Sequence, residues 1–201
     1  IREEVTTLWQ TDEVRHERPR VADEVKNVLF YLEEILFPLV PRFYAALERA
    51  CAHAAGRPVQ VPTLLRFGSW VGADMDGNPN VTPEVTVDTA LAQAARVISL
   101  YERETSSLGV VLSQSTQQVP VSADLLASLD DDAARAPELA VALEASTTRE
   151  PYRKKLRFIA ERLRAARAEL VAVREAHGAR APSFGPRCYR GPDELVRDLT
   201  S

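Results

Sequence analysis

The sequence predicts a mainly α-helical fold with one short strand, and three observations support this prediction. Apolar residues recur three or four positions apart along most of the chain, which places them on one face of a helix. Hydroxyl, proline and acidic residues stand where these segments begin, and glycine stands where two of them end. Residues 64–71 are apolar with few polar interruptions, as in a short buried strand of the parallel type.

The first part of the chain is predicted to be helical and interrupted by prolines. A helix should end near residues 9–15, and a second should begin after Pro19. The apolar positions of this second helix are Val25, Val28, Leu29, Leu32, Ile35, Leu36 and Leu39. We expect Pro38 and Pro41 to kink or break it, because proline removes a backbone hydrogen bond. A helix should then resume over residues 43–54 and stop at the glycine that follows.

Start signals also mark the helices of the second half. Thr82-Pro83-Glu84 combines a hydroxyl cap, a proline and an acid, and predicts a helix to about residue 109 that continues to residue 112. Ser122 should cap a short helix ending at residue 129, and the three aspartates at 130–132 should form a solvated turn. Further helices are predicted over residues 137–145, 151–176 and 192–199, the last two separated by a loop.

Composition excludes some classes of function. With 201 residues the chain can bury a sizeable core. A formal net charge of −4 and a pI near 5.5 argue against a nucleic-acid partner. No apolar run is long enough to span a bilayer. The two cysteines and three histidines show no metal-ligand spacing, so we predict no metal site and reduced thiols.

A single strand needs partners, so we expect the chain to be an internal piece of a larger fold. We divide it into a helical segment over residues 1–62, a strand with a Gly/Asp loop over residues 63–82, and a helical segment over residues 83–201.

The loop over residues 67–82 is the most informative part of the sequence. Gly72 and Gly77 can adopt positive φ without a steric penalty, and Asp or Asn side chains bind nearby backbone amides in tight turns. Pro79 restricts the residue before it to extended geometry. A rigid loop that carries Trp70 and two carboxylates indicates a site, although an ordinary strand-to-helix connection has a similar composition.

The pair Asp74 and Asp76 could bind a metal or act in acid–base chemistry. Together with Asn78 it imitates the start of an EF-hand loop. Pro79 stands where that loop requires glycine, and Val85 stands where it requires a bidentate glutamate, so calcium is rejected. The alternative is that these side chains cap turn amides, and we favour it for at least one of them.

The amino-acid sequences of two segments resemble those of a known family. Residues 67–82 closely resemble the F-G-S-W-x-G-G-D-x-D-G-N-P-x-V-T segment of phosphoenolpyruvate carboxylase. Residues 9–24 look like that family's W-x-T-D-E-I-R-x-x-R-P-x-x-x-D-E segment, in the right order and at the right spacing. A Val-Pro pair at 40–41 and Glu-Pro-Tyr-Arg at 150–153 are also similar. The resemblance is strong to about residue 101 and weaker beyond it.

The resemblance implies a mainly helical piece of an α/β, TIM-like barrel enzyme wrapped in helices. That enzyme adds bicarbonate to phosphoenolpyruvate and forms oxaloacetate and phosphate. The implied substrate-binding residues are Trp70, Gly72, Asp74, Asp76 and Asn78, with Trp70 shaping an apolar pocket wall at the C-terminal mouth of a barrel strand. Such a wall would shelter CO2 and the enolate intermediate from water.

The resemblance also implies what this chain lacks. No T-A-H-P-T-E segment with the family's catalytic histidine occurs in it, so no catalytic residue is expected here. Mg²⁺ should be bound by parts of the parent outside this chain, and the chain alone should be inactive. The expected setting is cytoplasmic, with the rest of the parent chain as partner, no membrane, and a homo-oligomer that the resemblance makes a tetramer.

Two departures from the family pattern keep an alternative open. Met75 stands where the family often has arginine between the aspartates, and Ala73 replaces a glycine. An arginine could orient an anion, and methionine cannot. The alternative is a non-catalytic helical scaffold or interaction module derived from the family.

Overall fold

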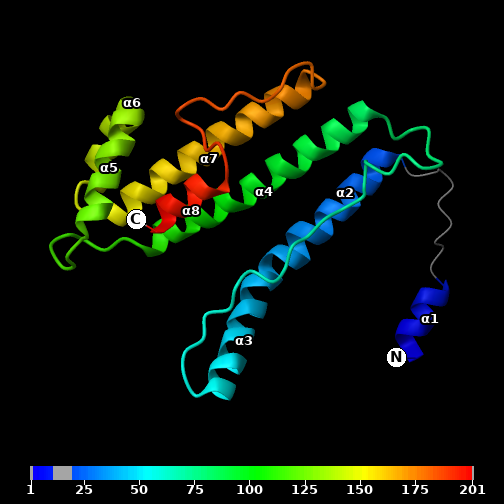
Figure 1. Cartoon of the computed structure of the whole chain (residues 1–201), viewed down its shortest axis with the longest axis horizontal. Coiled ribbons are helices and arrows are strands. Elements are labelled where there is room, and N and C mark those ends of the chain that lie inside the picture. Colours follow the sequence, from blue (N-terminus) through cyan, green and yellow to red (C-terminus); the bar gives the residue numbers. More distant parts are fainter. Residues whose placement is uncertain (1, 11–19, 201) are drawn as a thin grey trace.

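The protein is built of helices that pair side by side, as the computed structural model shows for residues 2–10 and 20–200 (Figure 1). The helices are α1 (Arg2–Gln10), α2 (Val21–Tyr31), the π-helical turn η1 (Leu32–Leu36), α3 (Phe37–Ala55), α4 (Pro83–Val111), α5 (Ala123–Arg135), α6 (Pro137–Thr147), α7 (Pro151–Glu175) and α8 (Pro192–Thr200). The second family-like motif falls largely on residues 11–19, outside the described ranges, as does most of the helix end predicted near residues 9–15.

Helices α4 and α7 form a long antiparallel pair that contains most of the core. Their direction is fixed at both ends by polar contacts. Near the end of α7, Arg174 Nε donates to Asp88 Oδ1 of α4 at 2.8 Å. Near its start, Arg153 Nε donates to the carbonyl oxygen of Gly109 at 2.9 Å. The apolar face of α7 that these contacts hold against the core consists of Leu156, Ile159, Leu163, Ala166, Leu170 and Val173.

Helices α5, α6 and α8 cover one end of this pair. Leu125 and Leu129 of α5 pack against Phe158 of α7, and all three are buried. The predicted cap is confirmed, because Ser122 Oγ accepts the amide hydrogen of Leu125 at 3.2 Å. Leu195 of α8 packs on the neighbouring part of α7.

The solvated turn predicted at residues 130–132 is wrong, because α5 continues through these aspartates to Arg135. Leu125, Leu129 and Asp132 recur at helical spacing, so Asp132 lies on the buried face and is only 2 % exposed. Lys155 of α7 is also buried, and its Nζ lies 2.7 Å from Asp132 Oδ2. The charge of each side chain is therefore compensated by the other.

A second carboxylate, Asp198 of α8, completes this network. Its oxygens lie 3.1 Å from Lys155 Nζ and 2.6 Å from a terminal nitrogen of Arg162, and they accept the Tyr189 hydroxyl at 2.7 Å. Burial raises the pKa of Asp132. For Asp198, burial acts in the same direction, but the hydrogen bond from Tyr189 and the charges of Lys155 and Arg162 outweigh it and lower the pKa. The network thus joins α5, α7 and α8.

Helix α7 ends at Glu175, close to the predicted end at residue 176, and Gly178 closes it with a φ of +68° and an amide that donates to the Val173 carbonyl at 3.0 Å. The following loop folds back onto the helix. Glu169 accepts hydrogen bonds from an Arg180 terminal nitrogen at 3.0 Å and from the Ser183 amide at 2.7 Å. The Arg180 bonds, followed by the Ser183 bond, lower the pKa of Glu169 to about 2. The loop that leads to α8 is therefore fastened by a carboxylate that remains charged at mild acidity.

Residues 21–55, here called the arm, form one continuous helical path of α2, η1 and α3. We expected Pro38 and Pro41 to kink or break the helix; it does not break at either proline, and Pro41 lies inside α3. Instead, the α pattern gives way to a π turn directly before Pro38, where the Phe37 amide donates to the carbonyl of Leu32, five residues earlier. A proline supplies no amide donor, and a π turn is one way for a helix to absorb such a local change in pairing.

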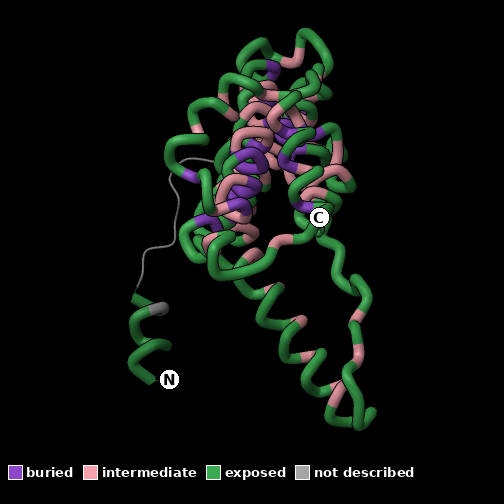
Figure 2. The backbone as a smooth tube through the Cα atoms, turned by 90° about the vertical axis from the view of Figure 1, so that its left-hand side faces the viewer, coloured by how far each residue is buried: buried purple, intermediate pink, exposed green. Residues whose placement is uncertain are grey.

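The arm is far less buried than the α4–α7 pair. In Figure 2 the buried positions gather in the bundle, and the lower part of the arm is exposed or intermediate. Helix α3 has no buried residue. Large apolar side chains exposed along the arm are Phe30, Tyr31, Ile35, Leu39 and Phe43.

The strand predicted at residues 64–71 is not formed, and no strand occurs in the described ranges. Residues 57–70, here called the strap, run extended beside the arm, and no neighbouring strand offers a hydrogen-bond ladder. The Tyr44 hydroxyl replaces part of the missing ladder, because its oxygen accepts the amide hydrogens of Leu64 at 2.7 Å and Leu65 at 3.0 Å. Leu64 and Phe67 are more than half exposed, so the burial that the strand prediction assumed is absent from this chain.

Among the described helices, none combines the length and apolar character needed to cross a membrane.

Replacing Asp132 should destabilise the 201-residue chain much more than replacing its neighbour. Asp132→Ala leaves Lys155 buried with only Asp198 as a charged partner. We expect a loss of about 3 kcal/mol in the free energy of unfolding, the lower end of the range for breaking a buried pair. Asp130→Ala is the matched control, because Asp130 is exposed on the same turn and its loss should cost within about 0.5 kcal/mol. Urea unfolding followed by circular dichroism measures both, and equal shifts of the two midpoints would show that the buried pair contributes nothing.

Candidate functional site

The candidate site is the loop over residues 70–82, which connects the strap to α4. Its end is fixed by the start of that helix. Thr82 is extended, and its Oγ1 accepts the amide hydrogen of Val85 at 3.4 Å, while Pro83 occupies the first helical position. This confirms the helix start predicted from the sequence, and it places the loop over the positive end of the α4 dipole.

Gly72 presses the loop against α4. Its φ is +71°, and a Cβ at this position would lie 2.2 Å from Thr89 Oγ1, closer than atoms can approach. One turn earlier on α4, the Thr86 hydroxyl donates to the Gly72 carbonyl at 2.9 Å. The family resemblance implied a substrate-binding role for Gly72, which stays a prediction, and the structure shows that Gly72 packs against α4.

Two turns with side-chain acceptors stiffen the rest of the loop. Asp74 Oδ1 accepts the Asp76 amide hydrogen at 3.2 Å, and Asn78 Oδ1 accepts the Asn80 amide hydrogen at 3.1 Å. Asp74 thus caps a turn amide, as we expected for at least one of the two aspartates. The side chain of Asp76 is exposed. The predicted site residues are therefore brought together on one short, internally bonded loop.

Trp70 lies at the first bend of this loop with its backbone fixed and its side chain free. Its carbonyl accepts the amide hydrogens of Ala73 at 2.9 Å and Asp74 at 3.2 Å. Its side chain is 80 % exposed, so within this chain it is not a core residue. An indole held outward by a rigid turn offers a large apolar face to a ligand or to another segment.

The base of the loop also packs on the arm. Val81 is buried in a cluster with Val21 and Val25 of α2, and Val71 and Val85 pack against this cluster. Loop, α2 and α4 therefore share one small apolar base, which fixes the direction in which Trp70 and Asp76 project.

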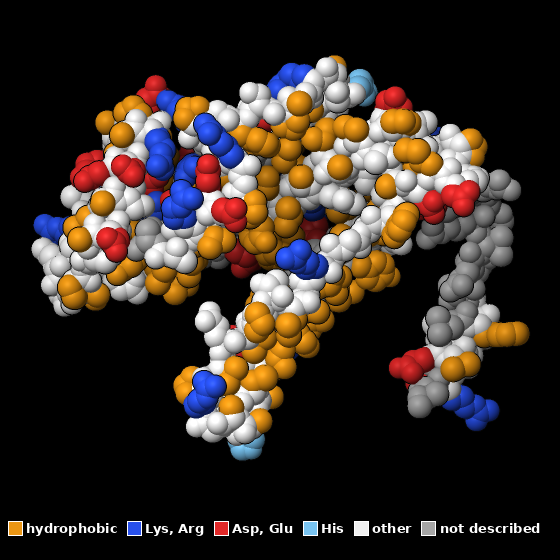
Figure 3. Space-filling model, in the orientation of Figure 1, with side chains coloured by type: hydrophobic (Ala, Val, Ile, Leu, Met, Phe, Trp, Pro, Cys, Tyr) orange, Lys and Arg blue, Asp and Glu red, His pale blue; other side chains and the backbone are white. Residues whose placement is uncertain are grey.

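An apolar hollow lies behind the strap, between the arm and α4 (Figure 3). Its volume is about 740 Å³. Phe67, Gly68 and Ser69 form one wall, and Glu33 and Arg96 form an ion pair at its edge. The apolar residues that line it include Leu29, Leu32, Leu36, Phe37, Val40, Val97 and Leu100. The segment that leads into Trp70 thus forms one side of this hollow, which remains open to solvent.

Sequence reasoning missed two features. One is the Tyr44 hydroxyl that holds the strap, which lies 20 residues from its partner and carries no local signal. The other is the charged network around Lys155. The helical spacing of Leu125, Leu129 and Asp132 is the sequence signal that could have shown that Asp132 lies on a buried helix face. Across residues 2–10 and 20–200, no group of three or more His, Cys, Asp or Glu side chains is placed to hold a metal ion. The loop thus offers only the carboxylates of Asp74 and Asp76, and Oδ1 of Asp74 is already bonded to the Asp76 amide.

Comparison with known proteins identifies the family. The sequence model described as phosphoenolpyruvate carboxylase matches residues 1–201. The chain belongs to the phosphoenolpyruvate carboxylase family.

Curated relatives agree with this assignment. A phosphoenolpyruvate carboxylase of Roseiflexus castenholzii is 46% identical over 81% of this chain and 18% of its own length. One of Prochlorococcus marinus subsp. pastoris is 41% identical over 99% of this chain and 21% of the relative. One of Xanthomonas euvesicatoria is 38% identical over 97% and 20%, respectively. The chain thus spans about a fifth of the length of these phosphoenolpyruvate carboxylases.

Alanine substitutions at the two loop glycines should separate packing from backbone strain. Both glycines have positive φ, near +70°, and left-handed geometry costs an alanine roughly 1–2 kcal/mol. Gly77 faces open space, whereas Gly72 faces Thr89. We expect Gly72→Ala to lose about 1–3 kcal/mol more than Gly77→Ala, because the loop must also move off α4. Thermal or urea unfolding measures the difference, and equal losses would mean that Gly72 does not pack against α4.

Removing one hydroxyl should release the strap. In Tyr44→Phe, the amides of Leu64 and Leu65 lose their acceptor, so their hydrogen exchange should accelerate, with a stability loss of about 0.5–1.5 kcal/mol. Tyr31→Phe is the control, since Tyr31 is an exposed tyrosine of the same arm. Hydrogen–deuterium exchange read by mass spectrometry over residues 57–70 is the measurement. Unchanged exchange in Tyr44→Phe would contradict the tether.

Proposed function

We propose that this chain is one internal piece of a phosphoenolpyruvate carboxylase, a lyase that adds bicarbonate to phosphoenolpyruvate and forms oxaloacetate and phosphate. The observation that carries the proposal is the family match over residues 1–201, which includes the distinctive loop with Trp70. All three segments, residues 1–62, 63–82 and 83–201, belong in this proposal to one domain of the parent enzyme.

In the proposed enzyme, Trp70 forms part of the apolar wall of the substrate pocket. Its exposed indole and its fixed backbone support this role, because a pocket wall must be rigid yet open to the ligand. Excluding water matters for this reaction, since an enolate that meets water takes up a proton and becomes pyruvate. The indole would act by limiting the access of water and exchanges no proton itself.

The other loop residues would shape the pocket around this wall. Gly72 lets the backbone lie close to α4, and Asp74 and Asn78 hold the turns through their amide partners. Asp76 is the loop carboxylate whose side chain is free to meet a substrate hydroxyl or a partner cation. We assign these residues to binding and positioning, and we assign no acid, base or nucleophile to this chain.

The remaining machinery is proposed to come from the rest of the parent chain. The Mg²⁺ of the proposed enzyme is assigned to segments of the parent outside residues 1–201, and residues 2–10 and 20–200 show no cluster of three or more His, Cys, Asp or Glu side chains that could hold it. The exposed arm supports a larger surrounding fold, which we propose to be a TIM-like barrel wrapped in helices. A cytoplasmic homotetramer is the assembly that we propose for the complete enzyme.

One observation favours a second candidate function. Met75 replaces the arginine that often lies between the two aspartates of the family loop, which removes a cation that could orient an anionic substrate. A non-catalytic scaffold that retains the helical shell would tolerate this change. Oxaloacetate formation by the full-length protein decides between them: its presence supports the enzyme, and its absence supports the scaffold. The 201-residue chain alone should form none.

Replacing Trp70 in the full-length protein should harm catalysis more than folding. Truncating a buried core tryptophan costs about 3–5 kcal/mol, whereas a pocket-wall tryptophan open on one side should cost less, about 1 kcal/mol. We expect Trp70→Ala to raise the KM for phosphoenolpyruvate and to raise the ratio of pyruvate to oxaloacetate, because water enters the pocket.

Trp70→Phe is the matched control, since it keeps an aromatic wall and should lie between the wild type and Trp70→Ala in both readouts. Coupled assays for oxaloacetate and pyruvate, together with the melting temperature, provide the data. A large fall in melting temperature with unchanged kinetics in the folded fraction would show that Trp70 is a structural residue, and the assignment would fail.

A further inference from the structure

The turn that carries Trp70 is held by two threonines of α4. It runs from Trp70 to Ala73, whose amide donates to the Trp70 carbonyl at 2.9 Å. Gly72 occupies the third position of this turn with a φ of +71°, and a type II turn requires a positive φ at that position. The side chains of Thr86 and Thr89 both reach Gly72. The place of Gly72 on α4 therefore determines where the turn lies.

Thr86 binds the carbonyl side of Gly72. Its hydroxyl has one proton and two carbonyl oxygens within reach, that of Gly72 at 2.9 Å and that of Thr82, one turn earlier on the same helix, at 3.2 Å. A threonine inside a helix often donates to the carbonyl four residues earlier, and that bond alone would give Thr86 no part in the loop. The shorter distance favours the bond to Gly72, which ties the loop to the helix.

Thr89 packs against the Cα side of the same glycine. It is buried, and its Oγ1, Cβ and Cγ2 atoms would lie 2.2, 2.9 and 3.0 Å from a Cβ placed on Gly72. These atoms leave the backbone of Gly72 no room to move toward α4, because packed atoms cannot interpenetrate. The bond from Thr86 keeps the same backbone from moving away. The two threonines thus hold the turn in both directions.

The segment of α4 that carries both threonines is itself fixed by α7. Arg174 donates from Nε and from a terminal nitrogen to the two carboxylate oxygens of Asp88, at 2.8 and 3.0 Å. Val87 lies close to Gly178, because a Cβ on that glycine would lie 3.1 Å from a Val87 methyl group. Residues 86–89 therefore contact the loop and the end of α7 at once. A residue that positions another needs rigid support of this kind.

We propose that Thr86 is a positioning residue for the reaction proposed above, with Thr89 as its packing support. The inference rests on that proposed function. The indole of Trp70 is 80 % exposed, so the backbone of the turn sets its direction. Without the Thr86 hydroxyl, the turn can leave α4, the indole moves out of the pocket wall, and water reaches the enolate. In this proposal Thr86 acts through Trp70 alone.

Variants of Thr86 in the full-length protein test this role. Thr86→Val keeps the shape of the side chain and removes its donor, so the amides of residues 70–82 should exchange about two- to tenfold faster, the scale of one lost neutral hydrogen bond. The ratio of pyruvate to oxaloacetate should rise by a similar factor, but less than in Trp70→Ala, because the indole is still present. Thr86→Ser keeps the donor and should restore both values. Hydrogen–deuterium exchange read by mass spectrometry and coupled assays for the two products are the measurements.

A double variant separates positioning from general stability. Because Thr86 acts through Trp70, adding Thr86→Val to Trp70→Ala should leave the product ratio of Trp70→Ala unchanged.

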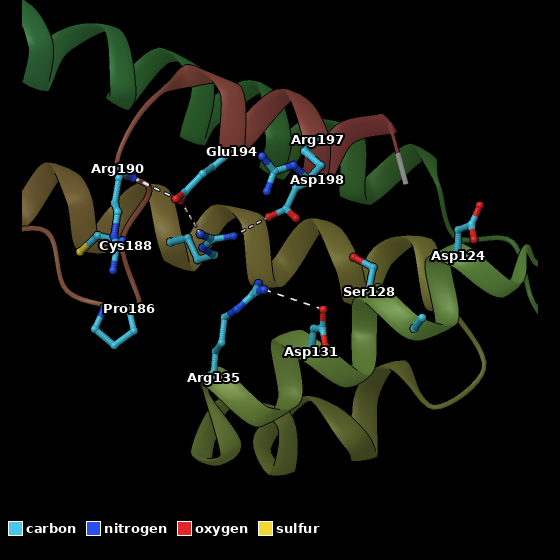
Figure 4. A pocket seen from close by; sticks show the side chains of 12 residues that line it. Asp124, Ser128, Asp131, Arg135, Pro186, Cys188, Arg190, Glu194, Arg197 and Asp198 are labelled. Carbon is cyan, nitrogen blue, oxygen red and sulfur yellow. Dashed lines mark hydrogen bonds and ion pairs between the residues drawn. The ribbon is translucent and has the colours of Figure 1, made fainter.

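Ser128→Ala is the matched control. Ser128 Oγ accepts a hydrogen bond from Lys155 in the charged network of α5, α7 and α8, at the other end of the bundle from the loop (Figures 1 and 4). Losing this hydroxyl should lower the melting temperature and leave the exchange of the loop and the product ratio at wild-type values. If circular dichroism shows that Thr86→Val is unfolded, Thr86→Ala replaces it, because alanine also lacks the donor and is the best helix former.

The outcomes distinguish this inference from the function on which it rests. Unchanged exchange of the loop in Thr86→Val would show that the hydroxyl bonds only to Thr82, and it would overturn the inference whether or not the protein is active. Faster exchange with an unchanged product ratio would overturn the positioning role and leave the carboxylase function standing. A wild type that forms no oxaloacetate would overturn the proposed function and the positioning role together, even where the exchange responds as expected.

Discussion

The antiparallel packing of α4 against α7 is the constraint on which the remaining structure depends. Apolar side chains at helical spacing on α7 bury against α4, and each buried leucine or isoleucine contributes roughly 1.5–3 kcal/mol by leaving water. The Trp70 loop leads directly into the start of α4, and α5 and α8 pack against the first half of α7. The Trp70 loop and the charged network of α5, α7 and α8 are therefore placed at different ends of one helical pair.

The two ends are stabilised by different physical means. The loop is stabilised by close packing and by hydrogen bonds to its backbone. Gly72 has no side chain and so lies against α4, and the hydroxyls of Thr82 and Thr86 bond to backbone groups. Asp74 and Asn78 accept hydrogen bonds from nearby amides. The α5–α7–α8 end depends on charge, with Lys155 buried and Arg162 half-buried among carboxylates. Charges taken out of water are costly unless every partner is present, so this end specifies one arrangement of its helices more strictly than apolar packing alone would.

The sequence predicted features that depend on residues close together in the chain, and it missed those that depend on residues far apart. The caps at Thr82 and Ser122 and the stops at Gly56 and Gly178 involve residues within a few positions of one another, and all four were predicted correctly. Residues 64–71 have the composition of a strand, but a strand requires a neighbour, and here a tyrosine hydroxyl replaces it. Asp132 was assigned to solvent because three aspartates favour a turn. Its partner Lys155 is distant in sequence, and no local rule reveals such a pair. For the site, the sequence supplied the loop and its turns, whereas the tether at Tyr44 arises only from folding.

The exposed arm has a consequence for how the chain is made. At synthesis rates of roughly 5–20 residues per second, α3 leaves the ribosome several seconds before α7, against which the core of the bundle forms. During that interval Phe30, Tyr31, Ile35, Leu39 and Phe43 face water on a helix that buries little even after the bundle has closed. The arm is therefore the part of the nascent chain most in need of a chaperone, and the part most prone to sticking to a neighbouring copy on the same messenger RNA.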